Sequence, residues 1–277
     1  MSGETAPAGE GGLAWERRVA PLAAAAAFSS GVLSVASILI PILAVGSQPG
    51  RDEEARALRL IDDNGAALLS AFGAQAAALV ALALTLFFLL RVTARRRPEA
   101  PKFAYGLLVL APLLVIVGGV LNQVDLADTA KEFVGSGPQT NARAESLIDD
   151  RSTTGGALLS GGGLALAISL VLVSLNAMRA GLLSRFMGIL GIIVGGLLVL
   201  PLLPGGQGFV QLFWTVALGL LFIDRWPGGR GPAWDTGRAI PWPTAAERSG
   251  EAVEPEAEPD PGAAERPASR KRRKNRR

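Results

Sequence analysis

The chain has 277 residues, of which 49% are hydrophobic and only 18% are charged, and its formal net charge is +3. This composition is too apolar for a soluble globular protein and indicates a protein whose solvent is lipid. Cysteine and histidine are both absent. Their absence excludes disulfides, thiolate catalysis, haem attachment and the usual zinc ligands, and it removes the commonest general base.

Long apolar runs, taken in chain order, predict membrane-spanning helices. A hydrocarbon core of about 30 Å needs about 20 apolar residues in helical form, because a helix satisfies its own backbone groups there. Four runs reach that length, the third only when its polar end residues are included. Two later runs are closer to the minimum, with PGGQG between them as a predicted tight turn. The six predicted spans are residues 21–45, 66–90, 105–121, 156–178, 186–203 and 209–223.

One nine-residue sequence occurs twice, as ARALRLIDD at 55–63 and as ARAESLIDD at 142–150. A short distance after each copy the tetrapeptide ALLS recurs, at 67–70 and 157–160. Each copy precedes an apolar run, so we interpret the pattern as a duplicated helical hairpin. The predicted fold is therefore an all-α polytopic membrane protein in which spans one and two repeat as spans three and four, followed by a third hairpin.

The basic residues favour a cytoplasmic N-terminus. Arg17 and Arg18 precede the first span, and five lysines or arginines lie in 91–102, between spans two and three. Six spans then place both termini inside and both repeats outside, with the two hairpins related by a pseudo-twofold axis along the membrane normal. The richness in alanine, arginine and glycine is typical of GC-rich bacterial genomes, so we expect the bacterial cytoplasmic membrane.

Two pairs of aspartates close the two repeats. They are Asp62 with Asp63 and Asp149 with Asp150. In the first interpretation, these residues and the neighbouring Asn64, Ser152 and Thr153 cap the amino ends of the spans that follow. In the second, the duplication brings the four carboxylates together as an all-oxygen site for calcium or magnesium.

The spans contain almost nothing ionisable, which argues against ion-coupled transport because such transport leaves charged residues along its pathway. The polar residues within them are Gln75, Asn176 and Gln211. Small residues four positions apart predict close helix packing. These pairs are Ser30 with Ser34, Gly156 with Ser160, and Gly191 with Gly195, and Gly161 to Gly163 form a continuous small patch.

The chain after the last span changes character. Residues 224–243 are rich in tryptophan, proline and glycine and are predicted to lie along the lipid headgroups. An acidic linker with low hydrophobicity follows and is predicted to be disordered. The chain ends in seven basic residues, Arg270, Lys271, Arg272, Arg273, Lys274, Arg276 and Arg277. They fit a charge cluster that fixes topology, a contact with anionic lipid headgroups, or a contact with the ribosome or another nucleic acid.

Residues 179–243 begin RAGLLSRFMGILGIIVGGLLVLPL and continue through FWTVALGLLFIDRWPGGRGPAW and AIPWP. This stretch resembles the C-terminal half of uncharacterised multi-pass membrane proteins of actinobacteria, and the resemblance implies no activity. The basic tail resembles those of membrane insertases of the Oxa family. An insertase groove would be expected to hold a charged residue, however, and these spans hold none.

Together these features predict a polar N-terminus (1–20), a transmembrane domain (21–223), a juxtamembrane segment (224–243) and a tail (244–277). We expect a non-enzymatic structural or partner-binding protein without a cofactor, in contact with the bilayer and with another membrane protein or a second copy. The alternative is a small permease for an apolar or neutral solute. A pocket lined by Gln75, Asn176 and Gln211 would favour the permease, and a glycine-packed interior would favour the partner-binding protein.

Overall fold

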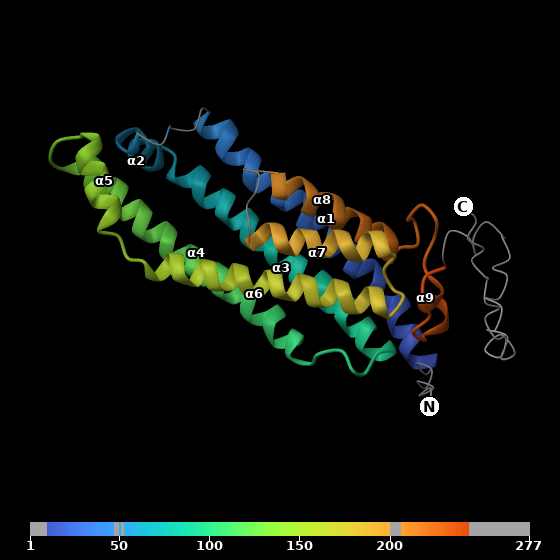
Figure 1. Ribbon diagram of the computed structural model, residues 1–277. Coiled ribbons are helices and arrows are strands. Elements are labelled where there is room, and N and C mark those ends of the chain that lie inside the picture. The colour runs from blue at the N-terminus through green and yellow to red at the C-terminus, as the bar shows by residue number, and fades with distance from the viewer. Residues whose placement is uncertain (1–9, 47–49, 51–52, 200–205, 244–277) are drawn as a thin grey trace, which may run out of the picture. The chain divides into compact units, whose positions relative to one another are not determined.

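The computed structural model describes residues 10–46, 50, 53–199 and 206–243, and every regular element in these ranges is a helix (Figure 1). The chain is therefore all-α in its described part, as predicted. The helices are α1 (Glu10–Val45), α2 (Glu54–Asp63), α3 (Gly65–Arg96), α4 (Phe103–Gly135), α5 (Asn141–Asp149), α6 (Thr154–Arg179), α7 (Arg185–Val199), α8 (Gly206–Phe222) and α9 (Pro232–Thr236).

Four helices, α1, α3, α4 and α6, are long and apolar enough to cross a membrane. The prediction of an all-α chain with several helices that could span a membrane is confirmed in this coarser form. Helices α7 and α8 have 15 and 17 residues, or about 22 and 25 Å at 1.5 Å per residue. Both fall short of a hydrocarbon core of about 30 Å, so the six-span count stays a prediction.

Several helices extend beyond their predicted spans. Helix α1 already begins at Glu10, so the second half of the predicted polar N-terminus is helical and continuous with the first span. Helix α4 runs on to Gly135 through a polar sequence that follows its apolar part. Its last turns therefore continue past the apolar part, toward the two short helices that carry the repeats.

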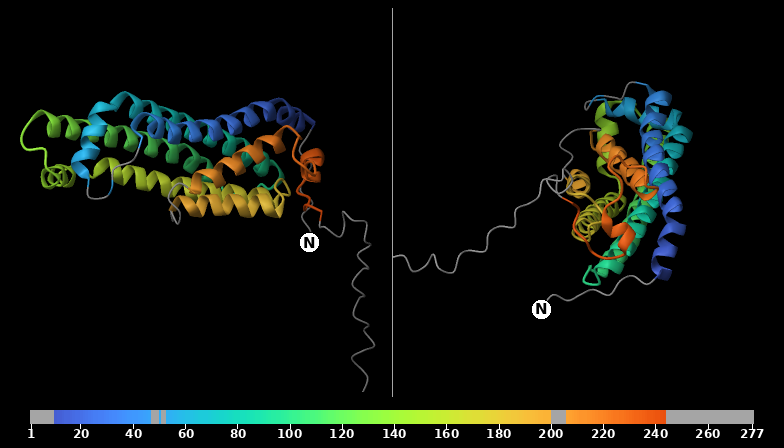
Figure 2. Two further views of the ribbon diagram at one scale, coloured as in Figure 1. Left: turned by 90° about the horizontal axis from the view of Figure 1, so that it is seen from above. Right: turned by 90° about the vertical axis from the view of Figure 1, so that its right-hand side faces the viewer.

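The long helices run side by side, with α2 and α5 at one end of the bundle and α9 at the other (Figures 1 and 2). Helix α1 packs along α3 and α8, while α6 packs along both α4 and α7. We call the two ends the α2/α5 end and the α9 end. The α9 end also holds the start of α1 and the α3–α4 and α6–α7 connections.

Both copies of the repeat form short helices at the same end, where α2 and α5 contact each other and the last turns of α4. A small hydrophobic cluster joins the three helices around Leu58, Phe133 and Ala144. The Asn141 side-chain oxygen accepts a hydrogen bond of 3.2 Å from the backbone N–H of Ala55. This placement supports the duplicated hairpin, which itself stays a prediction.

Helices α4 and α6 touch through their backbones. A Cβ atom added at Gly155 would lie 2.8 Å from the backbone nitrogen of Asn122, and one at Gly162 would lie 2.8 Å from that of Val115. No side chain larger than hydrogen fits at either position unless the helices separate. Glycine is therefore what permits the approach of α4 to α6.

The predicted small-residue contacts are confirmed for some positions only. Gly191 faces the Trp214 ring, and Gly195 lies against the carbonyl oxygen of Ala167. The pairing of Gly156 with Ser160 is wrong, because Ser160 is exposed and a Cβ at Gly156 would meet nothing within 4 Å. A Cβ at Gly161 or at Gly163 would also meet nothing within 4 Å. Of the predicted small patch Gly161 to Gly163, only Gly162 therefore faces another helix.

The α7–α8 hairpin does not reach as far along the bundle as its neighbours. Gly195 of α7 packs beside Ala167 of α6. From that contact α6 continues back to Thr154, about 13 residues or 20 Å, whereas α7 continues only to Val199, about four residues or 6 Å. The described part of α7 thus ends inside the length of the bundle.

Candidate functional site

The four aspartates of the repeats are exposed to solvent at the α2/α5 end. They are Asp62, Asp63, Asp149 and Asp150. Among the residues that the structure describes, no three acidic side chains lie close enough to hold a metal ion. The cation hypothesis therefore stays a prediction with no ligand set in the described chain.

The predicted helix caps differ in detail from those in the structure. Asn64 occupies the cap position of α3 and Thr153 that of α6, but neither side chain bonds to the helix that follows. The Asn64 amide instead donates to the carbonyl of Leu60, 2.9 Å away, and closes the end of α2. Only Ser152 behaves as predicted, with its hydroxyl accepting from the N–H of Thr154 at 3.3 Å.

The most tightly bound charges of the described chain lie at the α9 end. Glu16 of α1 is 4% exposed and Arg96 of α3 is 1% exposed. The guanidinium of Arg96 donates to both carboxylate oxygens of Glu16, at 3.0 and 2.8 Å. Its remaining Nε–H donates to the carbonyl of Ala233 at 2.7 Å. The pair is thus desolvated, bidentate and tied to α9.

Helical periodicity explains why these charges are buried. Glu16 begins a stripe of small buried residues on α1 whose spacing alternates between four and three. Arg96 ends a similar stripe on α3. The stripes continue through Ala20, Ala23, Ala27 and Ser30 on α1 and through Leu82, Leu86, Leu89 and Thr93 on α3. The count of basic residues in 91–102 does not distinguish Arg96 from its neighbours, whereas extending the stripe on α3 by one turn does.

Other arginines at the same end pack on aromatic rings. The guanidinium of Arg95 lies 4.3 Å from the centre of the Trp15 ring, and that of Arg91 lies 5.3 Å from it. Arg95 also approaches the Glu16 carboxylate at 3.5 Å. Such cation–π contacts stabilise a cation that is partly removed from water. Arg95 and Arg96 are therefore packed against neighbouring helices at the α9 end, while Arg91 stays exposed.

The juxtamembrane segment closes the α9 end. Trp234 is 6% exposed, and its ring N–H donates to the carbonyl of Leu182 at 2.9 Å. The expectation that this segment lies along lipid headgroups is therefore wrong for Trp234, which is buried among helix ends. Gly181 has φ +75° and sits directly against the carbonyl of Ile240, where a side chain could not fit.

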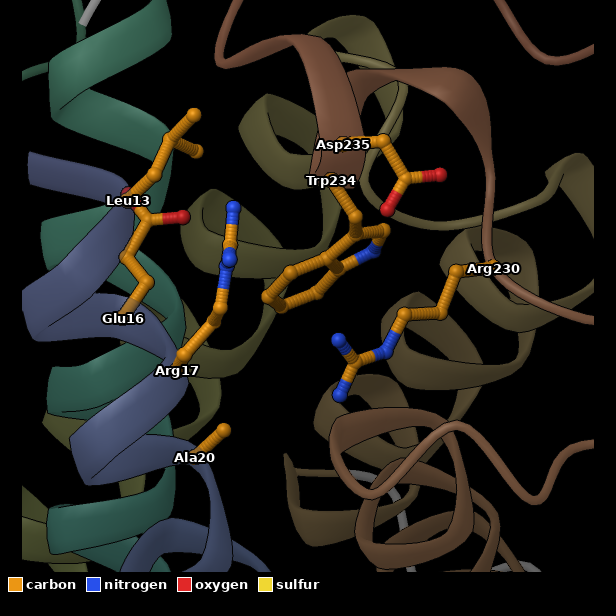
Figure 3. Close-up of a pocket in the computed structure, with 7 residues that line it drawn as sticks. All are labelled: Leu13, Glu16, Arg17, Ala20, Arg230, Trp234 and Asp235. Atoms are coloured by element: carbon orange, nitrogen blue, oxygen red, sulfur yellow. The ribbon is translucent and has the colours of Figure 1, made fainter. Parts of the chain in front are cut away.

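A cavity of about 200 Å³ opens beside Trp234. It is lined by Leu13, Glu16, Arg17, Arg230, Trp234 and Asp235, among others. Figure 3 shows Arg17 and Arg230 on opposite sides, each extending toward the Trp234 ring. Burial lowers the pKa of the Arg230 guanidinium, while the nearby carboxylates of Asp224, Asp235 and Glu16 raise it.

A second, more open cavity of about 300 Å³ lies among α1, α3 and α4. Gln75 and Gln123 line it, and the Ser37 hydroxyl donates to the Gln75 side-chain oxygen at 2.8 Å. Neither Asn176 nor Gln211 lines this cavity. Asn176 is 8% exposed and donates to the carbonyl of Leu172 within its own helix. The three polar residues therefore do not share this cavity.

No family model, curated protein or solved structure matches the chain. The resemblance over residues 179–243 accordingly stays a prediction.

Proposed function

We propose that the protein is a non-enzymatic component of the bacterial cytoplasmic membrane that binds a partner, with its basic tail in contact with lipid or with that partner. The observation that carries the proposal is the filled interior. Backbones touch at Gly155 and Gly162, and Gly191 receives the Trp214 ring. A bundle packed in this way supports a rigid platform better than a passage for solutes.

The charged residues also favour a non-catalytic role. Glu16 and Arg96 are the buried charged residues of the described chain, and they neutralise each other through a bidentate contact. Both carboxylate oxygens of Glu16 already accept hydrogen bonds from Arg96, so this buried carboxylate is occupied by a structural contact. The aspartates of the repeats are exposed and far from any such environment.

A small permease for a neutral solute is the second candidate. The cavity that includes Ser37, Gln75 and Gln123 favours it, since these side chains offer uncharged hydrogen-bonding groups between apolar helices. The cavity is open to the outside, and the glycines at the α4–α6 backbone contacts do not line it.

The proposal places the α9 end in the cytoplasm, because Arg91, Arg95, Arg96 and Arg97 lie there and basic residues are retained on that side. Cysteine labelling tests this orientation in a chain with no native thiol. With an impermeant reagent on intact cells, cysteine at Gly135 should react and cysteine at Glu99 should not. Labelling at Glu99 with protection at Gly135 would reverse the orientation.

The partner is tested by affinity purification from native membranes, comparing the full chain with one that ends at residue 243. The seven basic residues of the tail lie outside the described residues. A second variant keeps the full length and replaces all seven by glutamine, which separates the loss of these charges from the loss of the whole segment. We expect a membrane protein to co-purify with the full chain and to be lost from both variants.

Recovery of the same partner with all three chains would place the contact on the helix bundle instead of the tail. If no chain recovers a partner, and liposomes containing the purified protein take up a neutral solute, the permease replaces the partner-binding protein.

A further inference from the structure

The cavity at the α9 end presents two cationic groups to one aromatic wall (Figure 3). Arg17 is exposed and makes no hydrogen bond or ion pair with the described residues. Arg230 is half-buried, and its Nε–H donates to the carbonyl of Leu221 at 2.9 Å. Its two terminal nitrogens have no hydrogen-bond partner in the described part of the chain. Two guanidinium groups beside one cavity repel each other, so an anion between them would stabilise both.

The nearby carboxylates leave one positive charge uncompensated. Glu16 is held by Arg96 and approached by Arg95, and Asp224 lies 3.8 Å from the Nε of Arg230. Asp235 is exposed and lines the cavity. The charged residues that line the cavity are Arg17, Arg230, Glu16 and Asp235, and Glu16 is already neutralised by Arg96. With that pair set aside, the lining keeps one more positive than negative charge, which matches an anion with a single charge, as a phosphodiester has.

Size and position agree with such a group. A volume of about 200 Å³ is well above the roughly 10–15 Å³ that one water needs, so a phosphate with its ester carbons fits. Guanidinium groups present paired N–H donors that match phosphate oxygens. The cavity lies at the level where α3, a helix long and apolar enough to span a membrane, ends, and the lipid headgroups lie at the ends of such spans.

We propose that this cavity binds the phosphodiester group of an anionic phospholipid. Arg17 and Arg230 hold the phosphate oxygens, and the Trp234 ring forms the apolar wall beside them. Asp235 limits the affinity, because its carboxylate repels the ligand. The site uses none of the seven basic residues of the tail, and it is partly buried, so salt screens it less than it screens an exposed charge.

The test measures lipid binding to the full chain by native mass spectrometry, with phosphatidylglycerol as the anionic probe and phosphatidylcholine as the zwitterionic one. The measurement is made in about 0.5 M ammonium acetate, because the short Debye length there weakens binding by the tail. We expect R17Q to weaken phosphatidylglycerol binding about tenfold, the loss of a charged hydrogen bond.

R18Q is the matched control, since Arg18 is the next residue and also exposed but does not line the cavity. It should bind phosphatidylglycerol as the parent chain does. D235N should bind more tightly than the parent, a gain that misfolding cannot imitate. Equal affinities for the parent chain and R17Q, or no gain in D235N, would overturn the proposal.

Inorganic phosphate, added to the same samples as a competitor, separates a lipid from a soluble source. We expect it to displace phosphatidylglycerol only weakly and phosphatidylcholine to bind less well than phosphatidylglycerol. If phosphate binds in an Arg17-dependent manner while the two lipids bind equally, the ligand is a soluble phosphate and the lipid assignment is wrong.

Discussion

The two ends of the bundle treat charge in opposite ways. At the α9 end, Glu16 and Arg96 are buried, bidentate and capped by the carbonyl of Ala233. At the α2/α5 end the aspartates that close both repeats are exposed, and the exposed ion pair of Glu53 with Arg56 joins residues of one turn. The charged side chains are exposed to water at the α2/α5 end, whereas at the α9 end they form part of the packing between helices.

The difference follows from how many elements meet at each end. The start of α1, the end of α3 and helix α9 converge on the Glu16–Arg96 pair, so water is displaced from it. At the other end, α2 and α5 are short helices with only the last turns of α4 beneath them. In the described part of the chain, the outer faces of these two helices are exposed. A conspicuous sequence pattern therefore does not by itself indicate a buried site.

Replacing Arg96 should produce the largest loss of stability. R96M removes the bidentate partner of the buried Glu16 carboxylate and leaves it only the 3.5 Å contact with Arg95, which costs about 3–5 kcal/mol. The thermal unfolding midpoint of the detergent-solubilised protein should fall sharply. R97Q is the control, because Arg97 pairs with the exposed Glu99 at 3.3 Å and such surface pairs contribute about 1 kcal/mol or less.

The double variant E16L/R96M sharpens this comparison. Replacing both members of a buried ion pair by apolar residues is often neutral or stabilising, so the double variant should recover much of the stability that R96M loses. Equal midpoints for R96M and R97Q would show that the Glu16–Arg96 pair contributes no more to stability than the exposed Arg97–Glu99 pair.

The close approach of Gly181 to Ile240 gives the next largest effect. G181A places a methyl group against the Ile240 carbonyl and puts alanine at a position where φ is positive. Together these two effects should cost about 2–5 kcal/mol of stability. Gly228 also has a positive φ, of +94°, but a Cβ there meets nothing within 4 Å. G228A should therefore lose only about 1–2 kcal/mol. Similar unfolding midpoints for the two variants would mean that the Ile240 contact contributes nothing.

A smaller effect is expected from adjacent glycines in the middle of the bundle. G162A inserts a methyl group 2.8 Å from the Val115 backbone nitrogen, and such overpacking costs about 1–3 kcal/mol. At Gly163 the added methyl meets nothing within 4 Å, so G163A should be neutral or more stable by up to about 1 kcal/mol. Thermal unfolding of both variants checks the difference. If G163A is destabilised and G162A is not, then Gly163, and not Gly162, faces α4.

The sequence predicted the long helices well, because about 20 consecutive apolar residues leave few alternatives to a helix. It predicted the α9 end poorly. The contacts of Arg96 with Ala233 and of Trp234 with Leu182 join residues 137 and 52 positions apart. Periodicity reports only which face of a helix is apolar. It does not report which distant segment covers that face, so Arg17 and Arg230 could not be placed beside one cavity.

The α2/α5 end supplies the smallest expected effect, a pH dependence from Glu53. Its carboxylate accepts hydrogen bonds from the Gly50 N–H and from Arg56, both at 3.0 Å, and the first of these contributes most to lowering its pKa from the usual 4.5. Because the folded-state pKa is depressed, the contribution to stability is complete above 4.5 and is lost as the pH falls through the folded value.

E53Q should therefore unfold at a lower temperature than the parent at pH 6, and the difference should close as the pH approaches 3. The shift is small because Glu53 is exposed and its charge is screened. E54Q, one residue along, is the matched control, since no hydrogen bond of the Glu54 side chain is found among the described residues. If E54Q shows the same pH dependence, general charge at this end explains the effect, and the Glu53 contacts do not contribute. A difference that widens toward pH 3 would contradict the direction of the pKa change.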